Sequence, residues 1–309
     1  MRAGRRPVLL DGAKGTELQR LGVPVTDPWW TTSALLSDEG RALLTAIHRD
    51  YAEAGAELTT ANTFRTNLRA LLRAGAEHDQ ARTLVRTAVE AAREAIPASC
   101  GSVVAASMTS VEDCYQPQLV PTDDEELRRE HGWLADQLRD AGVELVMAET
   151  MNTVREAVAA TAACATRGLP VWTSFVCTSG ARLLSGEGLV AAAHAVADTG
   201  ASMVLVNCTT LEDTDEALEE LAADCPVPIG AYPNLEDRSE LDEWQPVNHY
   251  VPVRHGPEDF ADLMAERAIR FGLAAVGGCC GSTPAHIAAL HARLGPARPR
   301  ILPGRSVVR

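Results

Sequence analysis

Short apolar, β-branched runs alternate with longer amphipathic stretches along nearly the whole chain. The runs predict eight strands, at residues 8–11, 57–64, 102–109, 143–150, 170–177, 202–209, 227–234 and 274–281. In the other stretches apolar residues recur every three or four positions, which predicts helices. These helices are expected at residues 37–55, 79–96, 123–142, 152–168, 188–200, 211–225, 257–272 and 283–295. Several of them end at a glycine just before the next strand, as helices commonly do.

Strands that alternate with helices favour parallel pairing with right-handed crossovers. Eight such units within 309 residues predict an α/β fold, a single closed (β/α)₈ TIM barrel. An open doubly wound sheet is the alternative, but the first strand is not followed by the Gly-x-Gly-x-x-Gly turn of dinucleotide-binding sheets. We therefore expect one barrel domain over residues 1–297 and a basic tail at residues 298–309.

Composition excludes several classes of protein. The net charge of −14 argues against nucleic-acid binding, because phosphates attract surfaces rich in Lys and Arg. No stretch approaches the roughly 18 apolar residues of a membrane span, and the apolar run near the amino terminus is too short for a signal peptide. We expect a cytoplasmic protein that acts on small molecules, without a nucleic-acid or membrane partner.

Three of the eight cysteines are placed to hold a metal ion. Cys208 ends the sixth predicted strand, and Cys279 and Cys280 end the eighth, flanked by glycines that let the backbone turn both sulfurs to one side. In such barrels, the carboxyl ends of the strands meet at one mouth, where the active site lies. Three thiolates suit Zn²⁺ and leave a fourth position open for chemistry. The other five are expected to be small apolar residues: Cys100, Cys114, Cys164, Cys177 and Cys225.

Other polar residues end predicted strands at the same mouth. They are Asp11, Asn62, Thr63, Glu149, Asn207 and Asn234. Glu149 follows an apolar run, and a buried carboxylate is costly without a partner, which favours a functional role. Asp11 has the alternative of starting an Asp-Gly turn. The three asparagines have the alternative of binding loop backbone.

The motifs at these strand ends resemble those of the zinc-dependent homocysteine S-methyltransferase family. That family includes the S-methylmethionine- and betaine-dependent enzymes and the homocysteine module of cobalamin-dependent methionine synthase. The resemblance covers residues 8 to 295 and is most specific in Asn207-Cys208 and in the run Gly277-Gly278-Cys279-Cys280-Gly281. Supporting stretches lie at residues 10–18, 27–30, 59–64, 148–150, 232–234 and 283–287.

The resemblance implies that Cys208, Cys279 and Cys280 bind zinc, which in turn binds and deprotonates the thiol of homocysteine. It places Glu149 against the substrate ammonium, and Asp11, Gly12 and Ala13 against the amino-acid head group. We take Glu149 and Asp11 as catalytic residues. Candidate substrate-binding residues are Gly12, Ala13, Asn62, Thr63, Asn207 and Asn234.

The methyl donor is expected to be a sulfonium, either S-methylmethionine or S-adenosylmethionine. Attack by a thiolate on a sulfonium cancels charge, and the acidic stretch at residues 236–244 would favour a cation, with Trp244 available for a cation–π contact. That stretch has the alternative of a solvated loop. Only a basic tail follows residue 295, which in this family makes betaine the least favoured donor.

Alternatives exist for the methyl donor, for the acceptor and for the role of the zinc. The third strand lacks the Gly-Ser-x-Gly-Pro run common in single-domain members, and residues 179–186 resemble methionine synthase, so a separate methylcorrinoid protein is an alternative donor. The acceptor has the alternative of a different thiol or a selenol. A zinc hydrolase is disfavoured by three thiolate ligands. A structural zinc clip completed by His286 or His249 is the non-enzymatic alternative.

Overall fold

The computed structural model describes residues 6–97, 101–241 and 249–295. The eight predicted barrel strands are all present, and each pairs in parallel with its neighbours. They are β1 (Val8–Leu9), β2 (Leu58–Ala61), β3 (Val103–Met108), β4 (Leu145–Met151), β5 (Val171–Phe175), β8 (Val204–Asn207), β9 (Ile229–Tyr232) and β10 (Ala275–Val276). The predicted tail at residues 298–309 lies outside the described residues.

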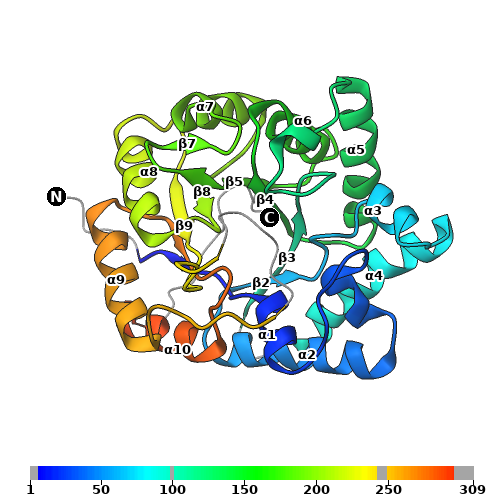
Figure 1. Ribbon diagram of the computed structural model, residues 1–309, viewed down its shortest axis with the longest axis horizontal. Helices are drawn as coiled ribbons and strands as arrows, with labels where there is room; N and C mark the ends of the chain where they lie inside the picture. The colour runs from blue at the N-terminus through cyan, green and yellow to red at the C-terminus, as the bar shows by residue number, and fades with distance from the viewer. Residues whose placement is uncertain (1–5, 98–100, 242–248, 296–309) are drawn as a thin grey trace, which may run out of the picture.

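The sheet closes on itself. Its hydrogen-bonded order runs β1-β10-β9-β8-β5-β4-β3-β2, and a parallel bridge between Leu10 and Leu58 joins the two ends. Figure 1 looks along the barrel and shows the helices as a ring around the strands. The (β/α)₈ TIM barrel predicted from the alternation is therefore confirmed.

Each of the eight predicted helices is present, together with short ones that were not predicted. The helices are α1 (Lys14–Arg20), α2 (Asp38–Glu53), α3 (Leu68–Arg73), α4 (His78–Ala95), α5 (Asp124–Asp140), α6 (Val154–Ala165), α7 (Leu189–Thr199), α8 (Leu211–Ala223), α9 (Pro257–Arg270) and α10 (Pro284–Leu294), with 3₁₀ turns η1 (Trp30–Leu35) and η2 (Pro117–Leu119). A small antiparallel hairpin, β6 (Cys177–Thr178) and β7 (Arg182–Leu183), follows β5. The unpredicted α1, α3, η1 and η2 are too short for a helical period to show in the sequence.

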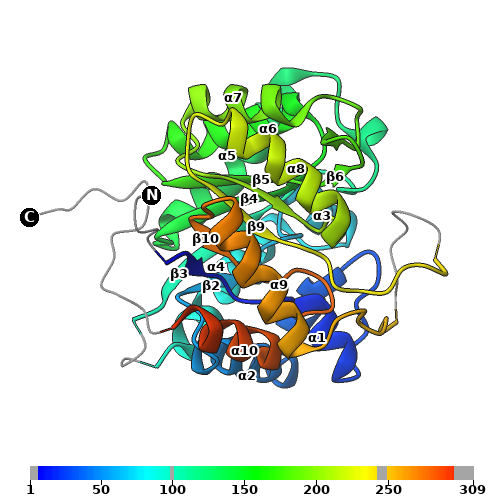
Figure 2. The same ribbon diagram turned by 90° about the vertical axis from the view of Figure 1, so that its left-hand side faces the viewer.

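Two apolar layers hold the fold together. Inside the barrel, Leu10, Leu58, Met147, Trp172 and Leu205 pack against one another and are nearly inaccessible to solvent. A larger apolar layer fills the space between the strands and the surrounding helices, and the side view of Figure 2 shows how those helices flank the strands. None of the described helices is long and apolar enough to cross a membrane.

Candidate active site

Three cysteines converge at the mouth of the barrel, as the sequence predicted. Cys208 directly follows β8, and Cys279 and Cys280 lie in the loop after β10. Their Sγ atoms all lie within 4.8 Å of one another, with 3.9 Å between those of Cys208 and Cys280, and Cys208 and Cys279 are joined as a disulfide. Within the described part of the chain, no other group of three or more His, Cys, Asp or Glu side chains is close enough to hold a metal ion.

Backbone hydrogen bonds fix the cysteine loop to the loop after β9. The Cys279 N–H donates to the Pro233 carbonyl at 2.9 Å, and the Leu235 N–H donates to the Cys280 carbonyl at 2.8 Å. The Ser282 hydroxyl donates to the Cys279 carbonyl at 2.7 Å. These backbone hydrogen bonds hold the loop that carries Cys279 and Cys280 in place.

Neither histidine of the structural-clip alternative joins the cysteines. His286 caps α10 instead: the Thr283 N–H donates to its Nδ1 at 3.2 Å, and its Nε2 lies 3.1 Å from the His255 carbonyl. His249 is exposed and outside the cysteine group. The geometry therefore leaves three protein ligands, as in catalytic zinc sites.

Glu149 projects into the same mouth from β4. The pairing register between β4 and β5 shifts between Ala148 and Met151, a bulge that re-aims the side chain between them. The Ser107 hydroxyl donates to one carboxylate oxygen of Glu149, and the Tyr232 hydroxyl donates to the other at 3.0 Å. Burial raises the pKa of Glu149, and the Ser107 hydrogen bond, the charge of Lys14 and the Tyr232 hydrogen bond oppose that rise.

Asp11 lies directly below the first βα loop and is nearly fully buried. Its carboxylate accepts the Thr60 N–H at 2.7 Å and the Thr60 hydroxyl at 3.1 Å, and forms an ion pair with Lys14 at 2.5 Å. Burial raises the pKa of Asp11, whereas Lys14 and Thr60 lower it. Asp11 therefore does more than begin an Asp-Gly turn. Its hydrogen bonds to Thr60 and its ion pair with Lys14 join the end of β1 to β2 and α1 at the mouth.

A buried polar network supports Glu149 from beneath. Tyr232 Oη lies 2.6 Å from Ser174 Oγ, and the Ser174 hydroxyl donates to Asn207 Oδ1 at 2.9 Å. Asn207 also accepts the Thr150 N–H at 3.0 Å and donates to the Thr150 hydroxyl at 2.8 Å. The amide of Asn207 is therefore fully used by protein groups. Its hydrogen bonds to Thr150 fix the position of β4 relative to β8.

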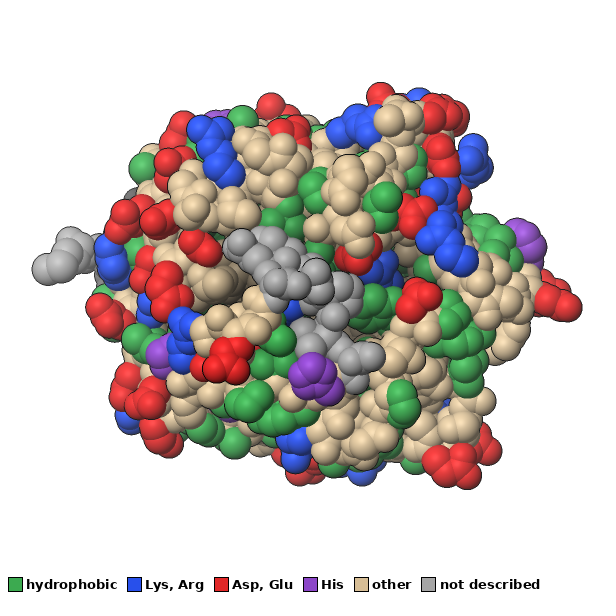
Figure 3. Space-filling view, viewed as in Figure 1, with side chains coloured by type: hydrophobic (Ala, Val, Ile, Leu, Met, Phe, Trp, Pro, Cys, Tyr) green, Lys and Arg blue, Asp and Glu red, His purple; other side chains and the backbone are tan. Residues whose placement is uncertain are grey.

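A cavity of about 210 Å³ unites these residues. Nine of the eleven predicted site residues line it: Asp11, Gly12, Ala13, Asn62, Glu149, Asn207, Cys208, Cys279 and Cys280. Thr63 does not, because its hydroxyl bonds both the carbonyl and the N–H of Ser107 on β3. Asn234 does not, because its Oδ1 accepts the Glu236 N–H. In Figure 3, which faces the mouth, acidic and basic side chains intermingle around the rim.

Several residues that line the cavity were not predicted to do so. Lys14, Arg65, Tyr115, Tyr232 and Arg238 all reach it. Tyr115 follows β3, so the atypical loop after the third strand does shape the mouth, as its departure from the family pattern suggested. Tyr232 ends β9 in the predicted motif at residues 232–234, and its position at a strand end was the signal for it.

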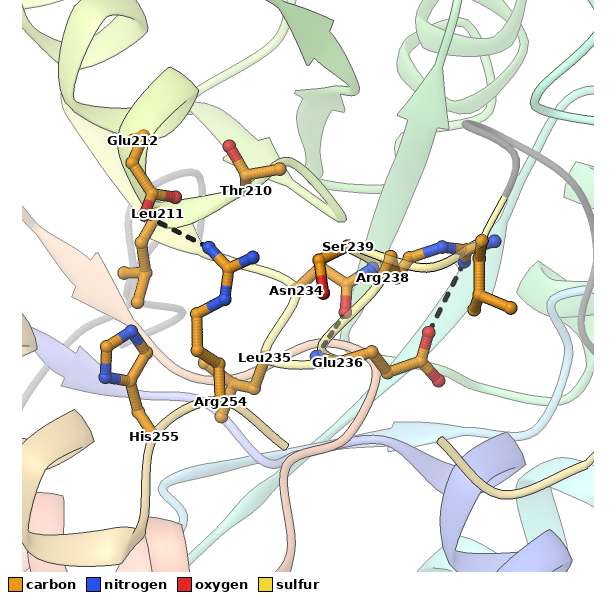
Figure 4. Close-up of a pocket in the computed structure, with 11 residues that line it drawn as sticks. Thr210, Leu211, Glu212, Asn234, Leu235, Glu236, Arg238, Ser239, Arg254 and His255 are labelled. Carbon is orange, nitrogen blue, oxygen red and sulfur yellow. Dashed lines mark hydrogen bonds and ion pairs between the residues drawn. The ribbon is translucent and has the colours of Figure 1, made fainter. Parts of the chain in front are cut away.

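The loop after β9 separates this cavity from a second one of about 280 Å³. Figure 4 shows the second cavity, with the Arg254–Glu212 ion pair on one side and the Glu236–Arg238 ion pair on the other, each at 3.3 Å. The Glu236 side chain is only 5% exposed, so the start of the acidic stretch is folded against the mouth and is not a solvated loop. Trp244 lies outside the described residues.

The glycine before the cysteine pair is required by close packing. A Cβ at Gly278 would lie 2.5 Å from the Ser282 Cβ. We expect Gly278→Ala to lower the free energy of unfolding by about 1–3 kcal/mol, the usual range for overpacking, and to reduce metal content by moving Cys279. Thermal denaturation and metal analysis measure both effects.

Gly256→Ala is the matched control, because a Cβ there meets nothing within 4 Å and φ is −71°. It should cost less than about 1 kcal/mol, as the loss of a glycine N-cap, with metal content unchanged. A Gly278→Ala protein as stable and as metal-rich as the Gly256→Ala protein would contradict the packing argument.

Known proteins resemble this chain in sequence and in fold. The homocysteine S-methyltransferase family profile matches residues 8–294. The selenocysteine Se-methyltransferase of Brassica oleracea var. italica is 28% identical over 93% of this chain and 88% of its own length. The methionine synthase of Mycobacterium tuberculosis (strain ATCC 25618 / H37Rv) is 29% identical over 92% of this chain, which spans 24% of that longer protein.

Solved structures of a homocysteine methyltransferase have the same fold as this chain. The metallated form of the homocysteine methyltransferase MmuM from Escherichia coli has a TM-score of 0.79 and 26% identity, covering 94% of this chain and 96% of that one. The apo form of the same protein has a TM-score of 0.70. The chain therefore belongs to the homocysteine S-methyltransferase family, and it is a methyltransferase.

Proposed function

We propose that the protein transfers a methyl group from a sulfonium to the thiol of homocysteine, giving methionine, with Zn²⁺ held by Cys208, Cys279 and Cys280. The observation that carries the proposal is the meeting of three sulfur atoms within 4.8 Å in a cavity that Asp11 and Glu149 also line. When bound, zinc supplies a Lewis acid that lowers the pKa of a coordinated thiol so that it is a nucleophile at neutral pH.

The spacing of the Cys208 and Cys280 sulfurs fits that ion, and binding it requires the Cys208–Cys279 disulfide to be reduced to two thiolates. Two thiolates bound tetrahedrally at 2.3 Å from zinc have their sulfurs about 3.8 Å apart. The Sγ atoms of Cys208 and Cys280 are 3.9 Å apart.

The two carboxylates would orient the acceptor. Glu149, aimed into the cavity by Ser107 and Tyr232, binds the substrate ammonium, and Asp11 fixes the loop that meets the head group. The Gly12 backbone and the Asn62 side chain line the same cavity and complete the pocket. Asn207, Thr63 and Asn234 act through their hydrogen bonds to its walls.

A sulfonium donor suits the charge of the mouth. Three cysteinates on a divalent ion carry a net charge of −1, and a fourth thiolate makes it −2. Transfer of a methyl cation from a sulfonium to that thiolate cancels charge, which a partly desolvated site favours over charge separation. The buried Glu236 beside the cavity adds a further negative group, although Arg238 pairs with it.

A donor panel tests the proposal. Zinc-loaded enzyme, homocysteine and either S-methylmethionine or S-adenosylmethionine should yield methionine with nothing else added. Betaine and methyltetrahydrofolate serve as negative controls. If no sulfonium supports turnover, the sulfonium assignment is wrong.

One observation favours a second candidate donor. The methionine synthase of M. tuberculosis is 29% identical over 92% of this chain, so a methylcorrinoid protein is the alternative source of the methyl group. Methionine that forms only when a methylated corrinoid protein is supplied would establish that alternative. Similarly, the likeness to a selenocysteine Se-methyltransferase makes a selenol the acceptor to compare with homocysteine.

A further inference from the structure

Lys14 is the single lysine in a chain with 28 basic residues. It lies at the start of α1 and lines the cavity that holds the three cysteines and Glu149. Every other basic side chain is an arginine, whose guanidinium is broad and planar, whereas the ammonium of lysine is a compact point charge.

The ammonium of Lys14 keeps a donor for the cavity. It donates to Asp11 Oδ2 at 2.5 Å and to the Gly12 carbonyl at 3.1 Å. An ammonium has three N–H donors, and the hydrogen bonds among the described residues use two of them. The side chain is 12% exposed, and because it lines the cavity, its third donor is available to a ligand there.

Two backbone donors of the first βα loop are already used by the protein. The Asp11 N–H donates to the Leu58 carbonyl at 3.1 Å, and the Ala13 N–H donates to Ser282 Oγ at 3.1 Å. The predicted role of Ala13 in binding a carboxylate through its N–H is therefore taken by a protein group. Of these three consecutive residues, only Gly12 has an N–H without a partner among the described hydrogen bonds, so besides the N–H groups that begin α1 the loop offers a carboxylate one backbone donor.

Charge balance points to the same residue. An amino-acid substrate brings one ammonium and one carboxylate to a site that already holds Asp11 and Glu149. Arg65 and Arg238 also line the cavity, but Arg65 donates to the Glu112 carbonyl and Arg238 pairs with Glu236. Lys14 is the cation paired with Asp11, and without it the incoming carboxylate would be repelled by Asp11 and Glu149, an effect that a site of low dielectric magnifies. With Lys14, each charge of the substrate has an opposite partner: Glu149 for the ammonium and Lys14 for the carboxylate.

We propose that Lys14 binds the carboxylate of the acceptor, so that the enzyme selects thiols whose carbon chain bears a carboxylate. This inference rests on the proposed function for the reaction and adds a specificity-determining residue to it. The ion pair with Asp11 holds the ammonium in place before the acceptor arrives, which reduces the cost of ordering the side chain on binding.

Binding of three thiols to a Lys14 variant distinguishes a role in carboxylate recognition from a purely structural role of Lys14. Homocysteine has both charged groups, 4-mercaptobutanoate lacks the ammonium, and 3-aminopropane-1-thiol lacks the carboxylate. In zinc-loaded Lys14→Met, calorimetry should show Kd raised about ten- to a hundredfold for the first two thiols, as for a lost charged hydrogen bond. For the aminothiol, Kd should change less than about twofold, and KM should follow the same pattern.

The control is Arg41→Met, which removes one positive charge from an exposed ion pair on α2 and should leave all three Kd values unchanged. Because Lys14 is the only lysine, protein that carries lysine labelled with ¹³C at Cε gives a single Cε resonance. That resonance should shift with the two carboxylate-bearing thiols and stay in place with the aminothiol.

Equal weakening of all three thiols in Lys14→Met would assign Lys14 a structural role and overturn the inference. Tighter binding of homocysteine would overturn it as well, because the lysine would then be competing with the substrate ammonium. Wild-type enzyme that binds none of the three thiols overturns the proposed function itself, which is a separate result.

Discussion

A Cys279→Ala protein is expected to bind no stoichiometric zinc and to lose thiol methylation. Two remaining cysteines, Cys208 and Cys280, give too few ligands for a site that keeps its fourth position open. Without the metal, the acceptor thiol, with its ordinary pKa near 8.5, is only about 3% ionised at pH 7, which alone costs roughly thirtyfold in rate. Metal analysis of the purified variant and a methylation assay measure the two losses.

Cys164→Ala is the matched control. Cys164 is buried within α6 and does not line the cavity at the mouth. Burial raises the pKa of its thiol to about 12, so it stays neutral, in keeping with the predicted role as a small apolar residue. That variant should keep its zinc and its activity. In the wild type, X-ray absorption should gain one sulfur scatterer when homocysteine is added, and a Cys279→Ala protein with full zinc and full activity would contradict the assignment.

The barrel could be predicted because strands and helices alternate regularly along nearly the whole chain. Eight apolar runs, each followed by a helical repeat, leave few alternatives once right-handed crossovers are required. The exact ends of strands were less predictable: β10 is only Ala275–Val276, so Cys279 and Cys280 lie in the following loop and not on the strand. The cysteines still converge, because a loop at a strand's carboxyl end opens onto the same mouth.

Side-chain direction was the harder part of the site. Thr63 and Asn234 sit in the predicted motifs, yet both turn away from the main cavity to bond neighbouring backbone. Tyr232 and Ser107 turn inward and hold Glu149. In a closed barrel these directions depend on strand stagger and on local bulges such as the one in β4, and neither is readable from residue types alone.

Ion pairing within the first loop was also hidden from the sequence. Lys14 stands among small residues in the motif at residues 10–18, and nothing in that order shows that its ammonium folds back onto Asp11. Likewise, Glu236 belongs to an acidic stretch that suggests a solvated surface, whereas the structure buries it against Arg238. Both pairs form because the closed barrel brings the loops together, so only the fold reveals them.

Replacing Glu149 with Gln is expected to raise the KM for homocysteine about ten- to a hundredfold, because the lost charge was the partner of the substrate ammonium. The amide keeps the shape of the side chain: its oxygen can accept from one of the two hydroxyls, Ser107 or Tyr232, and its NH₂ group can donate to the other. Zinc content should therefore stay unchanged. Isothermal calorimetry with homocysteine, together with metal analysis, separates loss of recognition from loss of the metal.

The pH dependence gives a second readout of the same carboxylate. Because burial raises the pKa of Glu149 above the ordinary 4.5, the group becomes neutral at a higher pH than an exposed carboxyl does. In the wild type, KM for homocysteine should rise as the pH falls through that raised pKa, since the neutral acid no longer pairs with the ammonium. Glu149→Gln should show no such rise, because its side chain is neutral throughout.

Glu156→Gln is the matched control for burial. Glu156 is a fully buried carboxylate on α6 that accepts the Val111 N–H at 2.8 Å and contacts His131 at 3.2 Å, and it does not line the cavity. Its replacement should lower thermal stability while leaving the KM for homocysteine unchanged. If Glu149→Gln instead binds homocysteine as tightly as the wild type, and loses only stability as Glu156→Gln does, then the carboxylate on β4 is structural and the ammonium has another partner.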